Sequence, residues 1–395
     1  MAVADSFPAL VVGAGPAGLA AAACLKQRGV EAVVLEAAPA LGDAWRHHYD
    51  RLRLHTVKEH SHLPGMPFAE ELSRYPSRAE MVAYLEAYAA HFGIAPRTNE
   101  AVRAVRPAQA AQSGQGGDDG FVVESTRGVH HARAVVLATG LNRVPNPEQL
   151  PDQNRFGGLL LHSAGYRNGD PFTGRRVLVV GAGNSGAEIA LDLAERGARP
   201  TLAVRTPINV VPREFLGMPT QVTSIRVRNL PIAVGDRIGR VVSRLAFGNL
   251  ARYGLARSEL GPLSAIKLRR RVPIIDVGTI AAIKRREIAV KPGVERLSET
   301  GAVFADGSAT SYDAVILATG FRPALAEIVA IPGVLDGDGY PRDWQGGGVC
   351  PNLFFVGYHQ PATGLLRQIG LDAEAVAAAI APNVRPGSAR GERAP

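Results

Sequence analysis

Cysteine is scarce in this sequence, because Cys24 and Cys350 are the only two among 395 residues. Two cysteines cannot build the disulfide framework of a small secreted domain, so their scarcity favours a reducing compartment and predicts a cytoplasmic protein. The sequence also lacks any run of about 18 uncharged apolar residues, so we expect no transmembrane helix and no stable membrane anchor. A charged start followed by an apolar run and a cleavage site is missing too, which predicts no signal peptide.

Aromatic residues are few as well, at 6% of the chain, while the formal net charge is +8. A nucleic-acid platform combines basic residues with interleaved aromatics, whereas the arginines here are spread along the chain. We therefore expect no nucleic-acid partner and attribute the charge in part to anionic cofactors. With 46% apolar and 20% charged residues, a chain of this length is expected to form two domains with large cores.

The first motif is a βαβ unit at residues 9–36, ALVVGAGPAGLAAAACLKQRGVEAVVLE. It comprises a short strand, a glycine loop, a helix that starts at Pro16 and ends before Gly29, and a second strand. In this setting G-x-G-x-x-G binds a dinucleotide pyrophosphate at the helix N-terminus, and Glu36 can accept the ribose hydroxyls. The loop residues predicted to contact the cofactor are Gly13, Gly15, Pro16, Ala17 and Gly18.

A second unit of the same plan occupies residues 175–206. Its second strand ends at Arg205 rather than at an acid, and an arginine there accommodates the 2′-phosphate of NADPH. Two dinucleotide sites in one chain predict an electron relay from a nicotinamide to a flavin, although the loops alone leave open which site holds the flavin. The loop residues predicted to contact NADPH are Gly181, Gly183, Asn184, Ser185 and Gly186.

Between residues 207 and 273 the βαβ rhythm is lost. Periodicity predicts a helix here with an apolar face and an arginine-rich face. An ordinary surface helix, a lid over the active site and a membrane-surface helix are the alternatives. The predicted apolar face consists of Val234, Ile238, Val241, Val242 and Leu245, and the basic face of Arg237, Arg240 and Arg244. Elsewhere, the composition of residues 109–120 predicts a flexible hairpin tip.

Residues 156–166, FGGLLLHSAGY, fit the pattern F-x-G-x-x-x-H-x-x-x-Y of class B flavoprotein monooxygenases, which lies between their two glycine loops. LATGF at residues 317–321 matches a second signature of that family. The stretches YDRLRLH, LPGMPF and GNSGAEIALDL, among others, make the chain similar to the YUCCA branch of the flavin-containing monooxygenases, over residues 9–379. The pattern residues are Phe156, Gly158, His162 and Tyr166.

This resemblance implies an α/β fold with two Rossmann-like dinucleotide-binding domains, in which the NADPH domain is inserted in the FAD domain. The FAD domain would comprise residues 1–166 and 311–381, the NADPH domain residues 167–310 with a helical segment at about 207–273, and residues 382–395 a disordered tail. Gly42 and Trp45 resemble the G-x-x-W loop beside the flavin, which assigns FAD to the first site. Further cofactor contacts are implied for Trp45, Val102, Thr139, Gly320 and Gly357, whereas His162 would brace the crossover rather than transfer a proton.

The resemblance also implies an activity, that of an NADPH- and FAD-dependent monooxygenase that uses a flavin C4a-peroxide. Molecular oxygen and a small molecule are the expected partners, and oxidative decarboxylation of indole-3-pyruvate or a similar aryl 2-oxo acid is the implied reaction. Oxygenation of nitrogen or sulfur in a soft nucleophile stays open, as does NADPH oxidase or reductase activity without oxygen transfer. A disulfide reductase would need two neighbouring cysteines, which Cys24 and Cys350 are not. Whether the protein is a homodimer also stays open.

The candidate catalytic residues are His55 and Lys58, within His55-Thr-Val-Lys58-Glu59, where many flavin-containing monooxygenases have N-x-x-K-E. His55 can donate a hydrogen bond or position substrate, the alternative being a buried structural histidine, and Lys58 can instead be an ion-pair partner. No metal site is expected, since the spacing of the histidines between residues 47 and 62 matches no zinc set. A 2-oxo acid would need an arginine for its carboxylate, for which the candidates are Arg213, Arg322 and Arg367.

Overall fold

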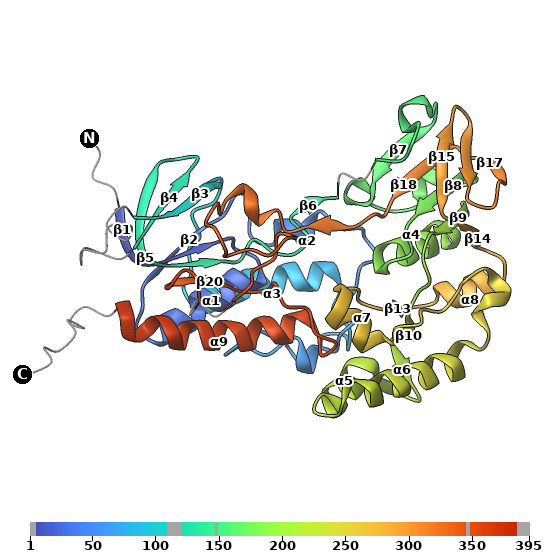
Figure 1. The fold of residues 1–395 in the computed structure, drawn as a ribbon. Coiled ribbons are helices and arrows are strands. Elements are labelled where there is room, and N and C mark those ends of the chain that lie inside the picture. Colours follow the sequence, from blue (N-terminus) through green and yellow to red (C-terminus); the bar gives the residue numbers. More distant parts are fainter. Residues whose placement is uncertain (1–4, 109–119, 147–148, 345–347, 385–395) are drawn as a thin grey trace, which may run out of the picture.

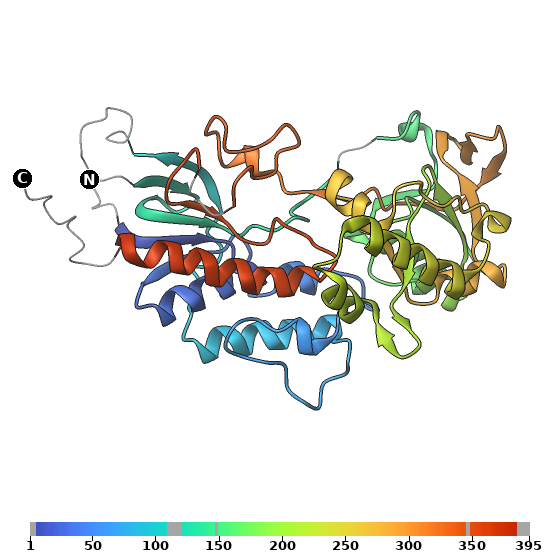
Figure 2. The same ribbon diagram turned by 60° about the horizontal axis from the view of Figure 1, so that its bottom comes forward.

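The computed structural model describes residues 5–108, 120–146, 149–344 and 348–384. These residues form two α/β halves that lie beside one another, with a group of helices below the second half (Figures 1 and 2). Most of the predicted flexible tip and residues 385–395 of the predicted tail lie outside the described residues. Residues 382–384, by contrast, belong to the last helix, α9 (Leu365–Val384), because its apolar face continues to the buried Val384. In the described ranges no helix is both long and apolar enough to cross a bilayer.

The first half contains a six-stranded sheet in the order β2-β1-β5-β4-β3, with β20 also paired to β5. Its strands are β1 (Asp5–Val12), β2 (Ala32–Leu35), β3 (Val102–Pro107), β4 (Phe121–Ser125), β5 (Val129–Leu137) and β20 (Leu353–Phe355). Helix α1 (Pro16–Gln27) packs against α9 and α3 (Arg78–His91), and the short α2 (Asp43–Arg46) contacts α3. The alanine-rich α1 is buried along almost its whole length, because alanine side chains let α9 and the sheet approach closely.

The second half contains a five-stranded parallel sheet in the order β14-β9-β8-β18-β7. Its strands are β7 (Leu159–His162), β8 (Arg176–Val180), β9 (Arg199–Val204), β14 (Ala289–Pro292) and β18 (Ala314–Leu317). Helices α4 (Asn184–Glu195) and α8 (Thr279–Lys284) contact one another beside this sheet. An antiparallel meander completes the half, formed by β15 (Val294–Ser298), β16 (Gly301–Phe304) and β17 (Ala309–Ser311).

The chain crosses between the halves twice, and the two crossing segments pair with one another. Strand β6 (Val144–Pro145) runs antiparallel to β19 (Phe321–Arg322). The second half is therefore an insertion in the first, as expected. The crossings nevertheless lie outside the expected limits. The resemblance implies that β7 and β18 belong to the FAD domain, whereas β18 pairs with both β8 and β7 in the second sheet. Their apolar runs match a buried strand of either sheet, so the sequence did not distinguish them.

The segment at residues 207–273 is mainly helical and lies beside the place where the two halves meet (Figure 2). Its helices are α5 (Thr220–Val227), α6 (Ile232–Phe247) and α7 (Pro262–Arg269). Short strands connect them, namely β10 (Val210–Pro212), β11 (Glu214–Phe215), β12 (Met218–Pro219) and β13 (Ile274–Asp276).

Only part of the apolar face that periodicity predicts for α6 is covered, since Ile238 and Val242 are half-buried and the other three residues are exposed. Val234, Val241 and Leu245 are 42%, 48% and 70% exposed. The buried face instead carries Asp236, whose Oδ1 accepts a hydrogen bond of 2.7 Å from the backbone nitrogen of Leu263 at the start of α7. A Cβ atom added at Gly239 would lie 2.6 Å from Cγ of Pro262. Small residues and the hydrogen bond that caps α7 decide which face of α6 packs against α7. Apolar periodicity alone does not identify that face.

Candidate active site

The two glycine loops have nearly the same geometry. Gly13 and Gly181 adopt φ of 102° and 109°, which glycine reaches without strain. A Cβ atom added at Gly18 would lie 1.8 Å from the carbonyl oxygen of Gly13, and one at Gly186 would lie 1.9 Å from that of Gly181. The first and third glycines of each loop are therefore needed for the turn and for helix packing.

The middle glycines face open space instead. No atom lies within 4 Å of a Cβ built at Gly15 or Gly183. Each is the N-cap of a 12-residue helix, α1 or α4, and neither N-terminus has a side-chain cap. Uncapped N–H groups beside open space make a site for an anion, as a pyrophosphate requires. Both loops thus fit the dinucleotides predicted from the sequence.

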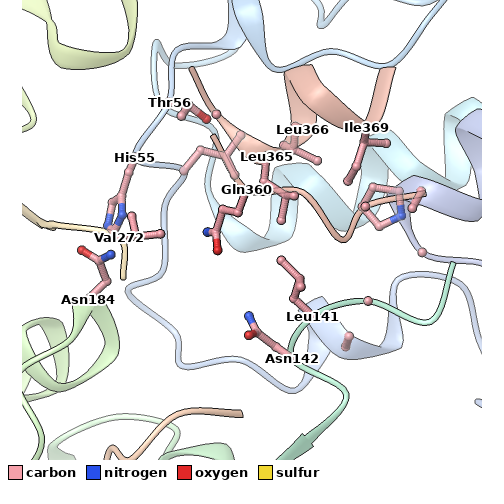
Figure 3. Close-up of a pocket in the computed structure, with 18 of the residues that line it drawn as sticks. His55, Thr56, Leu141, Asn142, Asn184, Val272, Gln360, Leu365, Leu366 and Ile369 are labelled. Carbon is pink, nitrogen blue, oxygen red and sulfur yellow. The ribbon is translucent and has the colours of Figure 1, made fainter. Parts of the chain in front are cut away.

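A cavity of about 1110 Å³ extends from the first loop to the start of α4 (Figure 3). It brings together predicted residues that lie far apart in the chain. Those that line it are Gly13, Gly15, Pro16, Ala17, Glu36, Trp45, His55, Val102, Thr139, Asn184, Ser185 and Gly357. The predicted residues outside its lining are Gly18, Lys58, Gly181, Gly183, Gly186, Arg205, Gly320 and the four residues of the crossover pattern.

Glu36 directly follows β2 beside the first loop and is held by two backbone groups. Its carboxylate accepts hydrogen bonds from the nitrogen of Ala14 at 2.5 Å and that of Ala38 at 2.8 Å. A carboxylate has about four lone-pair sites, so two remain for the ribose hydroxyls of a bound dinucleotide. Nearby, Thr139 accepts or donates a hydrogen bond of 2.7 Å with the hydroxyl of Tyr358, which fixes the loop after β5 at the cavity wall.

His55 lines the cavity, and its ring contacts a carboxylate that lies outside the lining. Its Nε2 is 2.6 Å from Oε1 of Glu188, a buried residue of α4. Figure 3 shows His55 and Asn184, which come from different halves of the chain. Asn184 itself is engaged with β13, since its Oδ1 accepts a hydrogen bond of 2.7 Å from the nitrogen of Ile275.

Lys58 does not line the cavity, and a catalytic role for it stays a prediction. Its ammonium group donates to three carbonyl oxygens, those of Ala69 at 3.3 Å, Leu72 at 2.7 Å and Glu70. An ammonium has three donors, and all are used here to hold the loop at residues 69–72. The sequence could not show this, because the acceptors are backbone atoms.

None of the three candidate arginines lines the cavity. Arg213 stacks over the ring of Tyr75, with its Cζ 4.2 Å from the ring centroid. Arg322 pairs with Glu327 at 3.2 Å. In the described ranges the only arginine or lysine in the lining is Arg143, which also pairs with Glu327, at 3.2 Å. Arg143 could not be found from the sequence, since it lies in a loop of ordinary composition between β5 and β6 and belongs to no motif.

The four residues of the F-x-G-x-x-x-H-x-x-x-Y pattern, here called the crossover pattern, all make structural contacts. A Cβ atom at Gly158 would lie 2.7 Å from both the carbonyl oxygen of Asp313 and Cζ of Phe156. His162 Nδ1 accepts a hydrogen bond from the nitrogen of Ala164, so the Nε2 proton points to the carbonyl oxygen of Gly320 at 3.2 Å. The hydroxyl of the buried Tyr166 donates to the carboxylate of Asp192 at 2.6 Å. These contacts join β7 to the segments on either side of β18, and join Tyr166 to α4.

The wall opposite the glycine loops is apolar and comes from the helical segment. Side chains of α5, α6, α7 and the β11–β12 hairpin contribute to it, including Phe215, Met218, Val227, Ile238, Val242, Leu263 and Ile266. Of the three alternatives left open for this segment, its place in the cavity lining favours a lid over the active site. Its apolar composition suits an aromatic or aliphatic group of a small molecule.

Arg205 is exposed and directly follows β9. The sequence analysis did not find Arg271, which contacts the next residue, Thr206. Arg271 donates a hydrogen bond of 3.2 Å to the hydroxyl of Thr206. Two guanidinium groups and a hydroxyl thus gather near the position where a 2′-phosphate would lie. Neither cysteine lines the cavity, and the described residues contain no group of three potential metal ligands.

Comparison with known proteins agrees with this arrangement. The sequence model of the family described as "Pyridine nucleotide-disulphide oxidoreductase" matches residues 10–214. Indole-3-pyruvate monooxygenase YUCCA1 of Oryza sativa subsp. japonica is 40% identical over 360 residues, which cover 89% of this chain and 86% of the relative. The chain belongs to the YUCCA family of flavin monooxygenases. Indole-3-pyruvate monooxygenase YUCCA6 of Arabidopsis thaliana is 37% identical, over 88% of this chain and 85% of the relative.

The solved structures place this YUCCA-family chain in the same fold. The flavin-containing monooxygenase from Stenotrophomonas maltophilia has a TM-score of 0.70 and 26% identity, covering 95% of this chain and 99% of that one. A steroid monooxygenase bound to NADP has a TM-score of 0.73 at 20% identity, covering 96% of this chain and 85% of that one, and shows the fold alone. The chain is a flavin-dependent monooxygenase with FAD and NADPH as cofactors, and its α/β fold with two dinucleotide-binding domains is confirmed.

Proposed function

We propose that this enzyme converts indole-3-pyruvate, or a closely similar aryl 2-oxo acid, into the acid that is one carbon shorter. The balanced reaction consumes the oxo acid, O₂, NADPH and a proton, and yields the shorter acid, CO₂, NADP⁺ and water. The observation that carries the proposal is the 40% identity to a relative named indole-3-pyruvate monooxygenase, over 89% of the chain.

The loops suggest how each cofactor is held. FAD would lie along the first loop, with its ribose at Glu36 and its ring near Trp45 and Gly357. NADPH would lie along the second loop, with its 2′-phosphate near Arg205 and Arg271. When bound, the flavin accepts hydride from NADPH and activates oxygen. The protein's own part is to align both cofactors, exclude water from the apolar wall and hold the substrate.

The substrate would lie against the apolar wall formed by α5, α6 and α7. An indole ring matches that wall in size and character, because such pockets bury flat aromatic groups. His55 lies within the same cavity and can form a hydrogen bond to the oxo acid. Arg143 is the residue that can attract its carboxylate, although it shares its charge with Glu327.

One observation favours a second candidate reaction. Arg213, Arg322 and Arg367, expected to hold a carboxylate, are all absent from the cavity lining. A cavity with so little positive charge also suits a neutral sulfide or an amine, whose oxygenation needs no arginine. This reaction would use the same loops and the same apolar wall.

The test is to incubate the purified holoenzyme with NADPH and a panel of substrates, and to compare product formed with NADPH consumed. Indole-3-pyruvate and phenylpyruvate represent 2-oxo acids, and a tertiary amine and a thioether represent soft nucleophiles. We expect indole-3-acetate and CO₂ in near-equal amounts to the NADPH consumed. Oxygenated amine or sulfide with no acid product would replace the first candidate by the second, and hydrogen peroxide alone would remove both.

We also propose that the FAD domain comprises the residues up to β6 and from β19 onward, with the NADPH domain between them. This division follows the pairing of β6 with β19 rather than the limits expected from the sequence. A cytoplasmic location is part of the proposal, since two unpaired cysteines suit a reducing compartment. Limited proteolysis at the crossover, followed by mass determination of the fragments, tests the division.

A further inference from the structure

Glu188 is a buried carboxylate in a position where the two halves meet. It belongs to α4, is 4% exposed and does not line the cavity. A buried carboxylate is costly unless its oxygens accept hydrogen bonds, so its partners explain why it is tolerated. Both partners come from the first half of the chain.

The first partner is His55, whose Nε2 lies 2.6 Å from Oε1 of Glu188. The second is Tyr49, which is 4% exposed and lies beside Glu188 and Ser185. Burial, followed by the negative charge of Glu188, raises the pKa of Tyr49 well above its ordinary value. The Tyr49 hydroxyl therefore keeps its proton, so that it can donate a hydrogen bond to Glu188 and accept one from Ser185.

The contact with Glu188 decides which ring nitrogen of His55 carries the proton and which one is an acceptor that faces the cavity. Because a carboxylate only accepts, the proton of a neutral His55 ring must be on Nε2. Nδ1 is then an acceptor, and in the described part of the chain it has no hydrogen-bond partner of its own. The side chain of His55 is 16% exposed, so this nitrogen is accessible from the cavity.

The same contacts connect the cavity wall to the second glycine loop. Ser185 lines the cavity at the N-terminus of α4, and His55 lines it from the first half. Resting on the proposed function, we propose that Glu188 is a positioning residue for the oxygenation reaction. It fixes the tautomer and orientation of His55, and through Tyr49 and Ser185 it does so only while the NADPH loop is docked as in this structure.

The test compares wild-type holoenzyme with Glu188→Gln, which keeps the size of the side chain but removes its charge. Histidine-selective ¹⁵N NMR reports the tautomer of His55 and does not depend on turnover. We expect a protonated Nε2 in the wild type, and a loss or marked shift of this signal in Glu188→Gln. In turnover, we expect the yield of oxygenated product per NADPH to fall about tenfold, the size expected for one charge-assisted hydrogen bond. The rate of flavin reduction should stay within about twofold of wild type.

The matched control is Glu195→Gln on the same helix. Glu195 is 56% exposed and pairs with Arg51 at 2.8 Å, away from the cavity. This variant should leave the His55 signal and the product yield unchanged. His55→Asn supplies the second arm, because it keeps a polar atom near Nδ1 and removes Nε2. In that background Glu188→Gln should cause no further loss of product yield.

An unchanged His55 signal in Glu188→Gln would overturn the inference. So would a loss of product yield from Glu188→Gln that is as large in His55→Asn as in the wild type. If Glu188→Gln does not fold, Tyr49→Phe replaces it, since it removes only the hydroxyl that donates to Glu188 and should shift the His55 signal and lower product yield. If the wild-type enzyme forms no oxygenated product, the proposed function is wrong. The NMR comparison would still show whether Glu188 fixes the tautomer of His55.

Discussion

The imidazole of His162 donates a hydrogen bond from Nε2 to the carbonyl oxygen of Gly320, across 3.2 Å. The same ring meets the ring of Phe321 edge-on, with centroids 5.1 Å apart. The end of β7 is thereby fixed to the segment that leaves β18 and returns to the first half. His162 does not line the cavity, so this contact describes a brace rather than an acid or a base.

Replacing His162 by leucine should destabilise the crossover. The substitution leaves the carbonyl oxygen of Gly320 without its donor, for an expected loss of about 1–2 kcal/mol in the free energy of unfolding. His162→Gln keeps a donor and should recover part of this loss. Denaturant unfolding of the holoenzyme measures both, and equal stabilities for leucine and glutamine would contradict the role of the hydrogen bond.

The pH dependence of stability should also involve His162. Burial lowers its pKa, against the opposing effect of the Gly320 hydrogen bond, so the folded protein binds a proton less readily than the unfolded chain. The stability from the neutral ring is therefore fully present above the unfolded pKa of about 6.5, and is lost as pH falls through the folded value. Melting temperatures from pH 5 to 8 should fall less steeply towards acid in His162→Gln than in wild type.

Alanine substitutions should separate the glycines that bind cofactor from those that shape the loops. Gly183→Ala places a methyl group in open space, so we expect normal folding and FAD content but at least a tenfold higher KM for NADPH. Gly186→Ala would bring Cβ to 1.9 Å from the carbonyl oxygen of Gly181, and should prevent proper folding. FAD absorbance, melting temperature and NADPH titration distinguish the two, and a destabilised Gly183→Ala would contradict the assignment.

Arg205 should determine the preference for NADPH over NADH. Arg205→Ala removes one of the two guanidinium groups near Thr206, and the ratio of kcat/KM for NADPH to that for NADH should fall about tenfold or more. Activity with NADH should change little, because NADH lacks the phosphate. A proportional loss with both nucleotides would show that Arg205 acts in some other way.

The apolar wall can be tested on a single helix. Ile238 lines the cavity, whereas Val241, three residues later, is 48% exposed and outside the lining. Ile238→Trp fills part of the wall and should raise the KM for indole-3-pyruvate several-fold without slowing flavin reduction by NADPH. Val241→Trp is the matched control and should leave both unchanged. Similar effects from the two variants would argue against this wall as the substrate site.

Much of the fold could be predicted because the two βαβ units carry local signals. Gly29 and Gly197 end their helices with positive φ, as their positions after an alanine-rich or amphipathic run indicate. The close approach of Gly18 to Gly13 is likewise encoded by the spacing of the loop. Such features depend on a few neighbouring residues, so a single sequence contains them.

The remaining features depend on contacts between distant segments. Lys58 and the buried Glu188 find their partners 11 to 14 and 133 residues away, respectively, and no spacing rule connects them. The buried face of α6 is set by Asp236 and two glycines that fit against α7, which outweighed the apolar periodicity. The three candidate arginines lie outside the cavity lining for the same reason. Proximity to a motif in the chain says little about which side chains line a cavity.

We expect this enzyme to insert one atom of molecular oxygen into a 2-oxo acid while releasing CO₂. The most direct measurement is turnover of indole-3-pyruvate with NADPH under ¹⁸O₂, followed by mass spectrometry of the product. We predict indole-3-acetate that carries one ¹⁸O atom in its carboxylate, in near-equal amount to the NADPH oxidised. Unlabelled indole-3-acetate, or NADPH oxidation in which all the label is recovered as hydrogen peroxide, would contradict it.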